Sequence, residues 1–193
     1  MNPLARQAVL TGAAGLLSLQ LWASPLPPEL RTALPMATLA GQAKLTFWGF
    51  AVYQATLWVV PGFDANAYAQ HEFALELAYL RDFSGADIAK RSLTEMARQT
   101  PISDALAARW DDQMRALFPD IKAGERLTGI NQPGLGARFM FNGEPLGEVL
   151  DAEFARLFFS IWLSQQTSEP KLRLGLLQQV TPVAATPVNT HYR

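Results

Sequence analysis

The side chains that most often carry out chemistry in proteins are scarce in this chain. Its 193 residues include no cysteine and only two histidines, His71 and His191. Without cysteine, thiol catalysis, thiolate metal sites and disulfides are excluded. Two histidines are also too few for a multi-histidine metal site, and they are a poor basis for a histidine-based catalytic triad. We therefore predict no metal site, no cofactor and no catalytic residue of these kinds.

Tyr53 and Arg81 are polar residues that could meet a ligand from two neighbouring strands. Because side chains alternate along a strand, Tyr53 projects with Ala51 and Ala55, and these small neighbours leave space beside its phenol. By the same rule Arg81 shares a face with Tyr79. An ordinary structural role stays open for both residues. The tyrosine could fill the core with its hydroxyl on a backbone carbonyl, and the arginine could pair with a nearby aspartate.

The stretch FWGFAVYQATLW, from Phe47 to Trp58, contains five aromatic rings in twelve residues and no charged group. It is too short to span a membrane as a helix and too apolar to lie in water. Gly49 interrupts its alternation, so we predict a bent hairpin or a bulged strand. Lys44 lies just before the stretch and shares a strand face with Trp48, which makes both candidates for contact with a ligand.

The N-terminal residues 1–23 have the pattern of a secretory signal peptide. Arg6 precedes a run of small and apolar residues, and Leu21 and Ala23 stand at the -3 and -1 positions of a cleavage site. An N-terminal anchor helix is the alternative, but polar residues interrupt a run already shorter than the roughly 20 residues that a spanning helix needs. We expect a periplasmic or secreted protein without stable membrane insertion after cleavage.

The composition is that of an ordinary globular domain. The chain is 49% hydrophobic and 17% charged, with a formal net charge of -1. Such a chain is long enough for one domain with a real core. It has no excess of lysine and arginine that could neutralise phosphates, so we predict no binding to nucleic acid. Its oligomeric state is left open.

Residues 39–177 are expected to form the folded domain, after an extended segment at 24–38 and before a disordered tail at 178–193. Alternating residues predict strands at 39–47, 50–60, 73–79, 126–131, 138–141 and 144–149. Capping residues and helical spacing predict helices at 84–100 and 103–118, a helix that begins at Asp151, and a short helix at 168–177. This order indicates an α+β fold with helices packed on one face of a largely antiparallel sheet.

Three segments, taken in their order and spacing, resemble the chalcone isomerase fold, and specifically its bacterial chalcone isomerase-like branch. They are LAGQAKLTFWGFAVYQATLWV, AYLRDFSGADIAKRSLTEM and FARLFFSIWLSQQTSEPKLRLGLL. The resemblance runs from about Leu39 to Leu177. It implies an open-faced β-sandwich, in which a curved, largely antiparallel sheet carries helices on one side and an apolar cleft lies between them. The aromatic stretch would then be the central hairpin of the sheet and would line the cleft.

The resemblance also suggests which residues stand at the catalytic positions of the plant enzymes in this family. Those enzymes use an Arg, a Thr, a Tyr, an Asn and a second Thr, which correspond in order to Lys44 or Leu45, Tyr53, Ile88, Glu95 and Ile161. Losing these polar groups would remove the transition-state stabilisation on which isomerisation depends. The fatty-acid-binding relatives are more similar, because they have a tyrosine at the position of Tyr53. In those relatives it is paired with an arginine that holds a carboxylate.

We therefore expect an exported, non-catalytic protein that binds an apolar, fatty-acid-like carboxylate in the cleft between sheet and helices. The predicted ligand-binding residues are Tyr53, Lys44, Arg81, Trp48, Tyr79, Ile88 and Ile161. Two alternatives remain: a chalcone isomerase-type intramolecular lyase, and an envelope interaction module whose cleft is filled by its own side chains.

Overall fold

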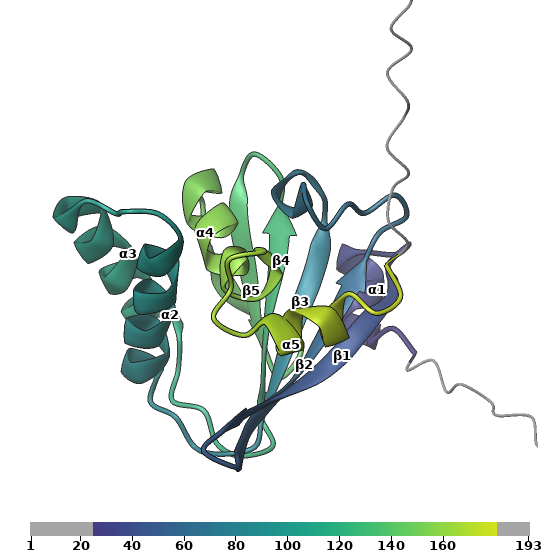
Figure 1. Ribbon diagram of the computed structural model, residues 1–193, viewed down its shortest axis with the longest axis horizontal. Coiled ribbons are helices and arrows are strands. Elements are labelled where there is room, and N and C mark those ends of the chain that lie inside the picture. The colour runs from purple at the N-terminus through teal and green to yellow at the C-terminus, as the bar shows by residue number, and fades with distance from the viewer. Residues whose placement is uncertain (1–24, 181–193) are drawn as a thin grey trace, which may run out of the picture.

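A computed structural model describes residues 25–180, which form a six-stranded antiparallel sheet flanked by helices (Figure 1). Each strand pairs with its neighbours in the sequence, so β1 and β6 form the two edges. The strands are β1 (Thr38–Phe47), β2 (Phe50–Val59), β3 (Phe73–Tyr79), β4 (Arg126–Gln132), β5 (Gly136–Phe141) and β6 (Glu144–Val149). In such a meander the first hairpin must lie at an edge, so the expectation that the aromatic stretch forms the central hairpin is wrong.

The helices mostly cover one face of this sheet, which confirms the predicted α+β class. They are α1 (Pro28–Ala33), α2 (Gly85–Gln99), α3 (Asp104–Leu117), α4 (Ala152–Leu163) and α5 (Pro170–Leu176), with a short 3-10 helix η1 (Tyr68–Gln70). Helix α4 packs on β4 and β5, and α5 packs on β1 and β2. Helix α2 is held mainly by α3 and α4, so α3 lies outside it (Figure 1).

Tight turns and helix caps fall where the sequence places them. The hairpin turns at Trp48–Gly49 and Asn142–Gly143 have positive φ at both residues, as two-residue turns of this kind require. At the start of α4, the Asp151 carboxylate accepts hydrogen bonds from two backbone N–H groups. The other carboxylate oxygen of Asp151 accepts a hydrogen bond of 3.0 Å from the indole N–H of Trp110 on α3.

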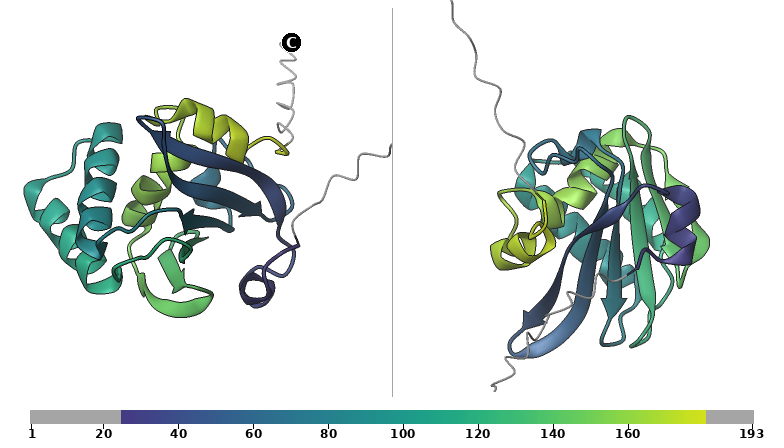
Figure 2. Two further views of the ribbon diagram at one scale, coloured as in Figure 1. Left: turned by 90° about the horizontal axis from the view of Figure 1, so that it is seen from below. Right: turned by 90° about the vertical axis from the view of Figure 1, so that its right-hand side faces the viewer.

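The prediction of an extended segment at 24–38 is wrong for its middle part, because residues 28–33 form helix α1. Pro28 stands in the first turn, where proline is tolerated. Leu30 and Leu34 are four residues apart and fully buried against Trp58 and Ile130. Figure 2 shows α1 on the face of the sheet opposite the other helices. The segment folds because these two leucines cover apolar side chains on that face.

The predicted signal peptide, residues 1–23, and nearly all of the predicted tail lie outside the residues that the structure describes. No helix within residues 25–180 is long and apolar enough to span a lipid bilayer.

Candidate ligand-binding pocket

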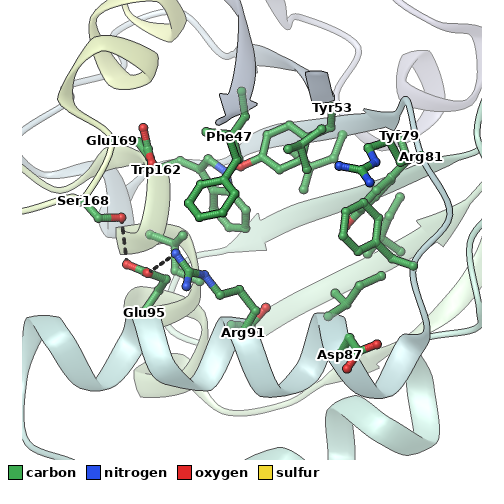
Figure 3. Close-up of a pocket in the computed structure, with 18 of the residues that line it drawn as sticks. Phe47, Tyr53, Tyr79, Arg81, Asp87, Arg91, Glu95, Trp162, Ser168 and Glu169 are labelled. Atoms are coloured by element: carbon green, nitrogen blue, oxygen red, sulfur yellow. Dashed lines mark hydrogen bonds and ion pairs between the residues drawn. The ribbon is translucent and has the colours of Figure 1, made fainter. Parts of the chain in front are cut away.

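A cavity of about 400 Å³ lies between the sheet and helices α2 and α4 (Figure 3). Strands β1 to β4, the two helices and the segment before α5 supply its walls. The walls are mainly apolar and include Leu45, Phe47, Leu77, Ile88, Phe158 and Ile161. This volume is near the lower end of the range of roughly 300–1,000 Å³ found for small-molecule pockets.

Five of the seven predicted ligand-binding residues meet at this cavity. Tyr53 and Tyr79 line it from β2 and β3, and Arg81 lines it from the segment just after β3. Ile88 and Ile161 line it from α2 and α4. Residues that are distant in the sequence therefore surround one space.

The prediction that Lys44 and Trp48 line the cleft is wrong. Leu45 lies opposite Tyr53 in the sheet and points into the pocket, so its neighbour Lys44 is exposed on the other face. Trp48 occupies the hairpin turn and is 86% exposed. Of the two residues that could stand at the position of the family arginine, Lys44 and Leu45, only Leu45 lines the pocket, and its side chain carries no charge.

A register shift in the β1–β2 hairpin changes which residues face the pocket. Leu45 pairs with Tyr53, but the next residue, Thr46, pairs with Ala51. Val52 is the extra residue on β2 and lines the pocket. The prediction that Ala51 shares the face of Tyr53 is therefore wrong. Simple alternation cannot detect such a bulge, because it assumes a regular strand.

Tyr53 is the central polar group of the pocket. It is 9% exposed, and its hydroxyl accepts a hydrogen bond of 2.9 Å from Nε1 of Trp162. Burial is the main cause that raises the pKa of Tyr53 well above 10.0, and burial likewise raises the pKa of Tyr79. Within residues 25–180, no group accepts the Tyr53 proton in a hydrogen bond. This phenol is therefore a neutral O–H donor that is available to a ligand.

Arg81 supplies a cation at the pocket wall. Its guanidinium carbon lies 5.5 Å from the centre of the Phe50 ring. It takes part in none of the ion pairs formed within residues 25–180. The next two aspartates along the chain contact other groups, Asp82 with Lys122 and Asp87 with Ser84. The arginine is therefore able to pair with an anionic ligand.

A second polar cluster at the pocket, centred on Glu95, was not predicted as a site. Glu95 is 5% exposed and pairs with Arg91 at 2.8 Å and with Arg98 at 3.4 Å. The Ser168 hydroxyl donates a hydrogen bond of 2.8 Å to the same carboxylate (Figure 3). The spacing of the two arginines from Glu95 on α2 gives a sequence signal, but the contact with Ser168 depends on tertiary structure. The cluster ties α2 to the segment before α5.

Trp162 is another polar pocket residue that was not predicted. Its position four residues after Phe158 on α4 is the only local signal, and that spacing equally fits a core residue. Among residues 25–180, no three side chains of the metal-binding types come together as a possible metal site. The pocket thus combines mainly apolar walls with a neutral donor and the Arg81 cation, and its rim also carries Arg91 and the carboxylates of Asp87, Glu95 and Glu169. Beside Arg81, this arrangement is suited to an apolar molecule that carries an anionic group.

Comparisons with known proteins agree with this architecture. An uncharacterized protein of Haemophilus influenzae is 30% identical over 139 residues, which cover 71% of this chain and 66% of that protein. The chain thus spans slightly less than two thirds of that relative's length. A crystal structure of an Arabidopsis thaliana fatty-acid binding protein has a TM-score of 0.58 at 11% identity, over 74% of this chain and 87% of the other. At this low identity the likeness shows the fold alone.

A family model described as chalcone isomerase-like matches residues 27–178. The match includes α1, every strand and every helix of the described chain. The chain therefore belongs to the chalcone isomerase-like family.

Proposed function

We propose that this protein is a non-catalytic binding protein for an apolar carboxylate of the fatty-acid type. The observation that carries the proposal is that one mainly apolar cavity is lined by both Tyr53 and Arg81, whose hydroxyl and guanidinium donate to no other side chain within residues 25–180. The acyl chain would lie against the apolar walls, and the carboxylate would accept a charge-assisted hydrogen bond from Arg81, with the Tyr53 hydroxyl as a further donor in the cavity. A solved structure with a similar fold is that of a fatty-acid binding protein, which supports the same class of ligand.

The residues around the cavity argue against isomerase chemistry. Where the resemblance to the plant enzymes would place a tyrosine and a threonine, the pocket has Ile88 and Ile161. Glu95, at the position of the family asparagine, is already engaged by Ser168 and two arginines. An open cavity also argues against the alternative of a cleft filled by the protein's own side chains.

Burial of the acyl chain supplies most of the binding free energy. A chain of roughly a dozen methylenes at about 0.8 kcal/mol each gives about 10 kcal/mol. Association and ordering oppose binding by at least about 4 kcal/mol, whereas a charge-assisted hydrogen bond contributes about 1.5–3 kcal/mol. The balance corresponds to a Kd of roughly micromolar. Such an affinity suits a carrier or a sensor.

Titration with a fluorescent fatty acid, followed by displacement with dodecanoate, tests this proposal. Arg81→Gln removes the Arg81 cation from the pocket wall and should weaken binding about tenfold. Tyr53→Phe should weaken it about tenfold or less, because the acyl chain remains buried. Lys44→Gln is the matched control, since it removes an exposed cation from the opposite face and should leave the affinity unchanged. No binding to wild type at about 100 micromolar, or equal affinity in all variants, would contradict the proposal.

We also propose that the protein is exported and that residues 1–23 are removed. The support is the arrangement of Arg6, the apolar run and the small residue Ala23. N-terminal sequencing of the native protein should find a start near Ser24, in a fraction outside the cytoplasm. An intact Met1 on the native protein would contradict the proposal.

A further inference from the structure

The tip of the β1–β2 hairpin exposes a continuous group of aromatic side chains. This hairpin tip consists of residues 47–50, in which Phe47, Trp48 and Phe50 are 60%, 86% and 64% exposed. The rings of Phe47 and Trp48 stack, with their centroids 5.8 Å apart. A single exposed hydrophobic residue is ordinary, but three aromatic rings within four residues form a contiguous apolar patch. Figure 2 shows that this hairpin extends away from the rest of the sheet.

The turn at the hairpin tip is an unusual place for a tryptophan. Trp48 has a φ of 51°, and such turns favour asparagine or aspartate before glycine. A bulky side chain in this left-handed region is uncommon, because its Cβ is crowded by the backbone. Since the indole is 86% exposed, it gains little burial in return. A surface outside the chain would explain why an aromatic residue stands there.

Positive charges lie beside the hairpin tip. Lys44 is exposed on one face of the hairpin, and Arg81 lies over the ring of Phe50 on the other. Asp82, which follows Arg81, is paired with Lys122 at 3.0 Å, so its charge is offset. Tryptophan at the level of lipid headgroups, with lysine and arginine near anionic phosphates, is the usual arrangement at a bilayer surface.

The hairpin tip is continuous with the mouth of the pocket. Phe47 belongs to the tip and also lines the cavity, and Arg81 contacts Phe50 from the cavity wall. A ligand that leaves a bilayer beneath the tip could therefore enter the pocket along apolar side chains. A stable protein interface buries about 1,000 Å² or more, which three side chains do not provide. A lipid surface fits this small patch better than a protein partner.

We infer that the hairpin tip docks on the surface of an anionic lipid bilayer. Trp48 and Phe50 enter the interface, Lys44 and Arg81 lie near the headgroups, and the pocket opens toward the membrane. Docking itself needs no ligand. The further statement that the pocket exchanges its ligand with the bilayer rests on the proposed function.

Vesicle flotation tests this docking with the mature chain and no added fatty acid. The vesicles contain either phosphatidylcholine alone or phosphatidylcholine with about one phosphatidylglycerol in three lipids. Wild type should bind the anionic vesicles, and added salt should weaken this binding. Trp48→Asn should lower the affinity about tenfold, because the indole no longer enters the interface. Lys44→Gln should lower it about fivefold.

Trp48→Asn keeps the fold, because Asn-Gly is the favoured pair for this turn, so its melting temperature should be equal or higher. Its affinity for dodecanoate in solution should be unchanged, which separates docking from the proposed ligand binding. Leu135→Asn is the matched control: Leu135 is 62% exposed in the β4–β5 turn, at the opposite end of the sheet, and its loss should not affect flotation. Failure of wild type to float would overturn the inference, as would equal flotation of wild type and Trp48→Asn. A concentration-dependent dimer that Trp48→Asn disperses would overturn it in favour of a second copy of the chain.

Discussion

Two halves of the space between the sheet and its helices are filled in opposite ways. In the packed half, below α4, phenylalanine rings meet edge to face, with Phe159 at 4.8 Å from Phe73 and 5.4 Å from Phe158 between ring centroids. In the open half, between β2, β3 and α2, a cavity of about 400 Å³ remains. Both halves use the same face of the same sheet.

The difference follows from how the two helices are held. Helix α4 rests directly on β4 and β5, so its aromatic side chains fill the layer beneath it. Helix α2 is held mainly by α3 and α4, and its pocket face carries Ser92 and the ion-paired Glu95. A helix supported by other helices can leave space above a sheet without losing its own packing. The packed half thus stabilises the fold, and the open half is available for a ligand.

Removing a ring from the packed half should have the largest effect on stability. Phe159 is fully buried, so Phe159→Ala should lower the free energy of unfolding by about 3–5 kcal/mol. Ile161→Ala, on the same helix but at the cavity wall, should cost less than about 2 kcal/mol, since its side chain already borders open space. Urea unfolding measures both values. Equal losses would remove the distinction between the two halves.

Enlarging a side chain should destabilise the packed half more than the open half. A Cβ at position 129 would lie 3.0 Å from the Phe159 ring, so Gly129→Ala should destabilise the fold by about 1–3 kcal/mol. Ile88→Trp adds far more volume, but into the cavity, and should change stability by less than about 1 kcal/mol. The same variant should abolish ligand binding. A larger loss of stability in Ile88→Trp than in Gly129→Ala would show that the cavity does not accept added volume.

Within the open half, one hydrogen bond should matter to the fold as well as to the ligand. Tyr53→Phe leaves Nε1 of Trp162 without its acceptor and should cost about 1–3 kcal/mol of stability. Tyr79→Phe is the matched control, because the Tyr79 hydroxyl makes no hydrogen bond within residues 25–180, and it should cost less. Thermal unfolding of the two variants gives the comparison. A smaller loss in Tyr53→Phe than in Tyr79→Phe would contradict this role of Tyr53.

The smallest expected effect is on the alkaline side of the stability profile. The pKa values of Tyr53 and Tyr79 are raised by burial above the ordinary value of 10.0. Above pH 10 the unfolded chain therefore loses protons that the folded chain retains, so stability should fall as pH rises. Absorbance of tyrosinate in the folded protein should show that these two residues stay protonated there. The Tyr53→Phe, Tyr79→Phe double variant should lose stability less steeply, and an equal slope would contradict the assignment.

Most of the fold could be predicted from sequence because local patterns determine it. Alternation placed every strand to within a few residues, and Ser84, Ser103 and Asp151 cap helices where they were expected to do so. The helix at 28–33 was missed because several prolines favoured an extended segment. Its leucines show their role only when the far face of the sheet is known.

Among the strand residues, the site was predictable where alternation remains regular, whereas Ile88 and Ile161 on the helices were predicted from the family resemblance. Tyr79 ends the regular strand β3 and Arg81 follows two residues later, and both lie at the pocket as predicted. Lys44 was misplaced because the resemblance left its position interchangeable with Leu45, and only the pairing with β2 distinguishes the two. The hydrogen bond from Trp162 to Tyr53 joins residues 109 positions apart, so no local signal could reveal it.

Native mass spectrometry after addition of dodecanoate tests the central claim most directly, because it counts ligands bound to each chain. We expect one dodecanoate on wild type and on Lys44→Gln, and none on Ile88→Trp, whose indole fills the cavity. A wild-type chain that carries no dodecanoate would contradict the account. The same number of ligands on wild type and Ile88→Trp would also contradict it, since the ligand would then bind outside the pocket.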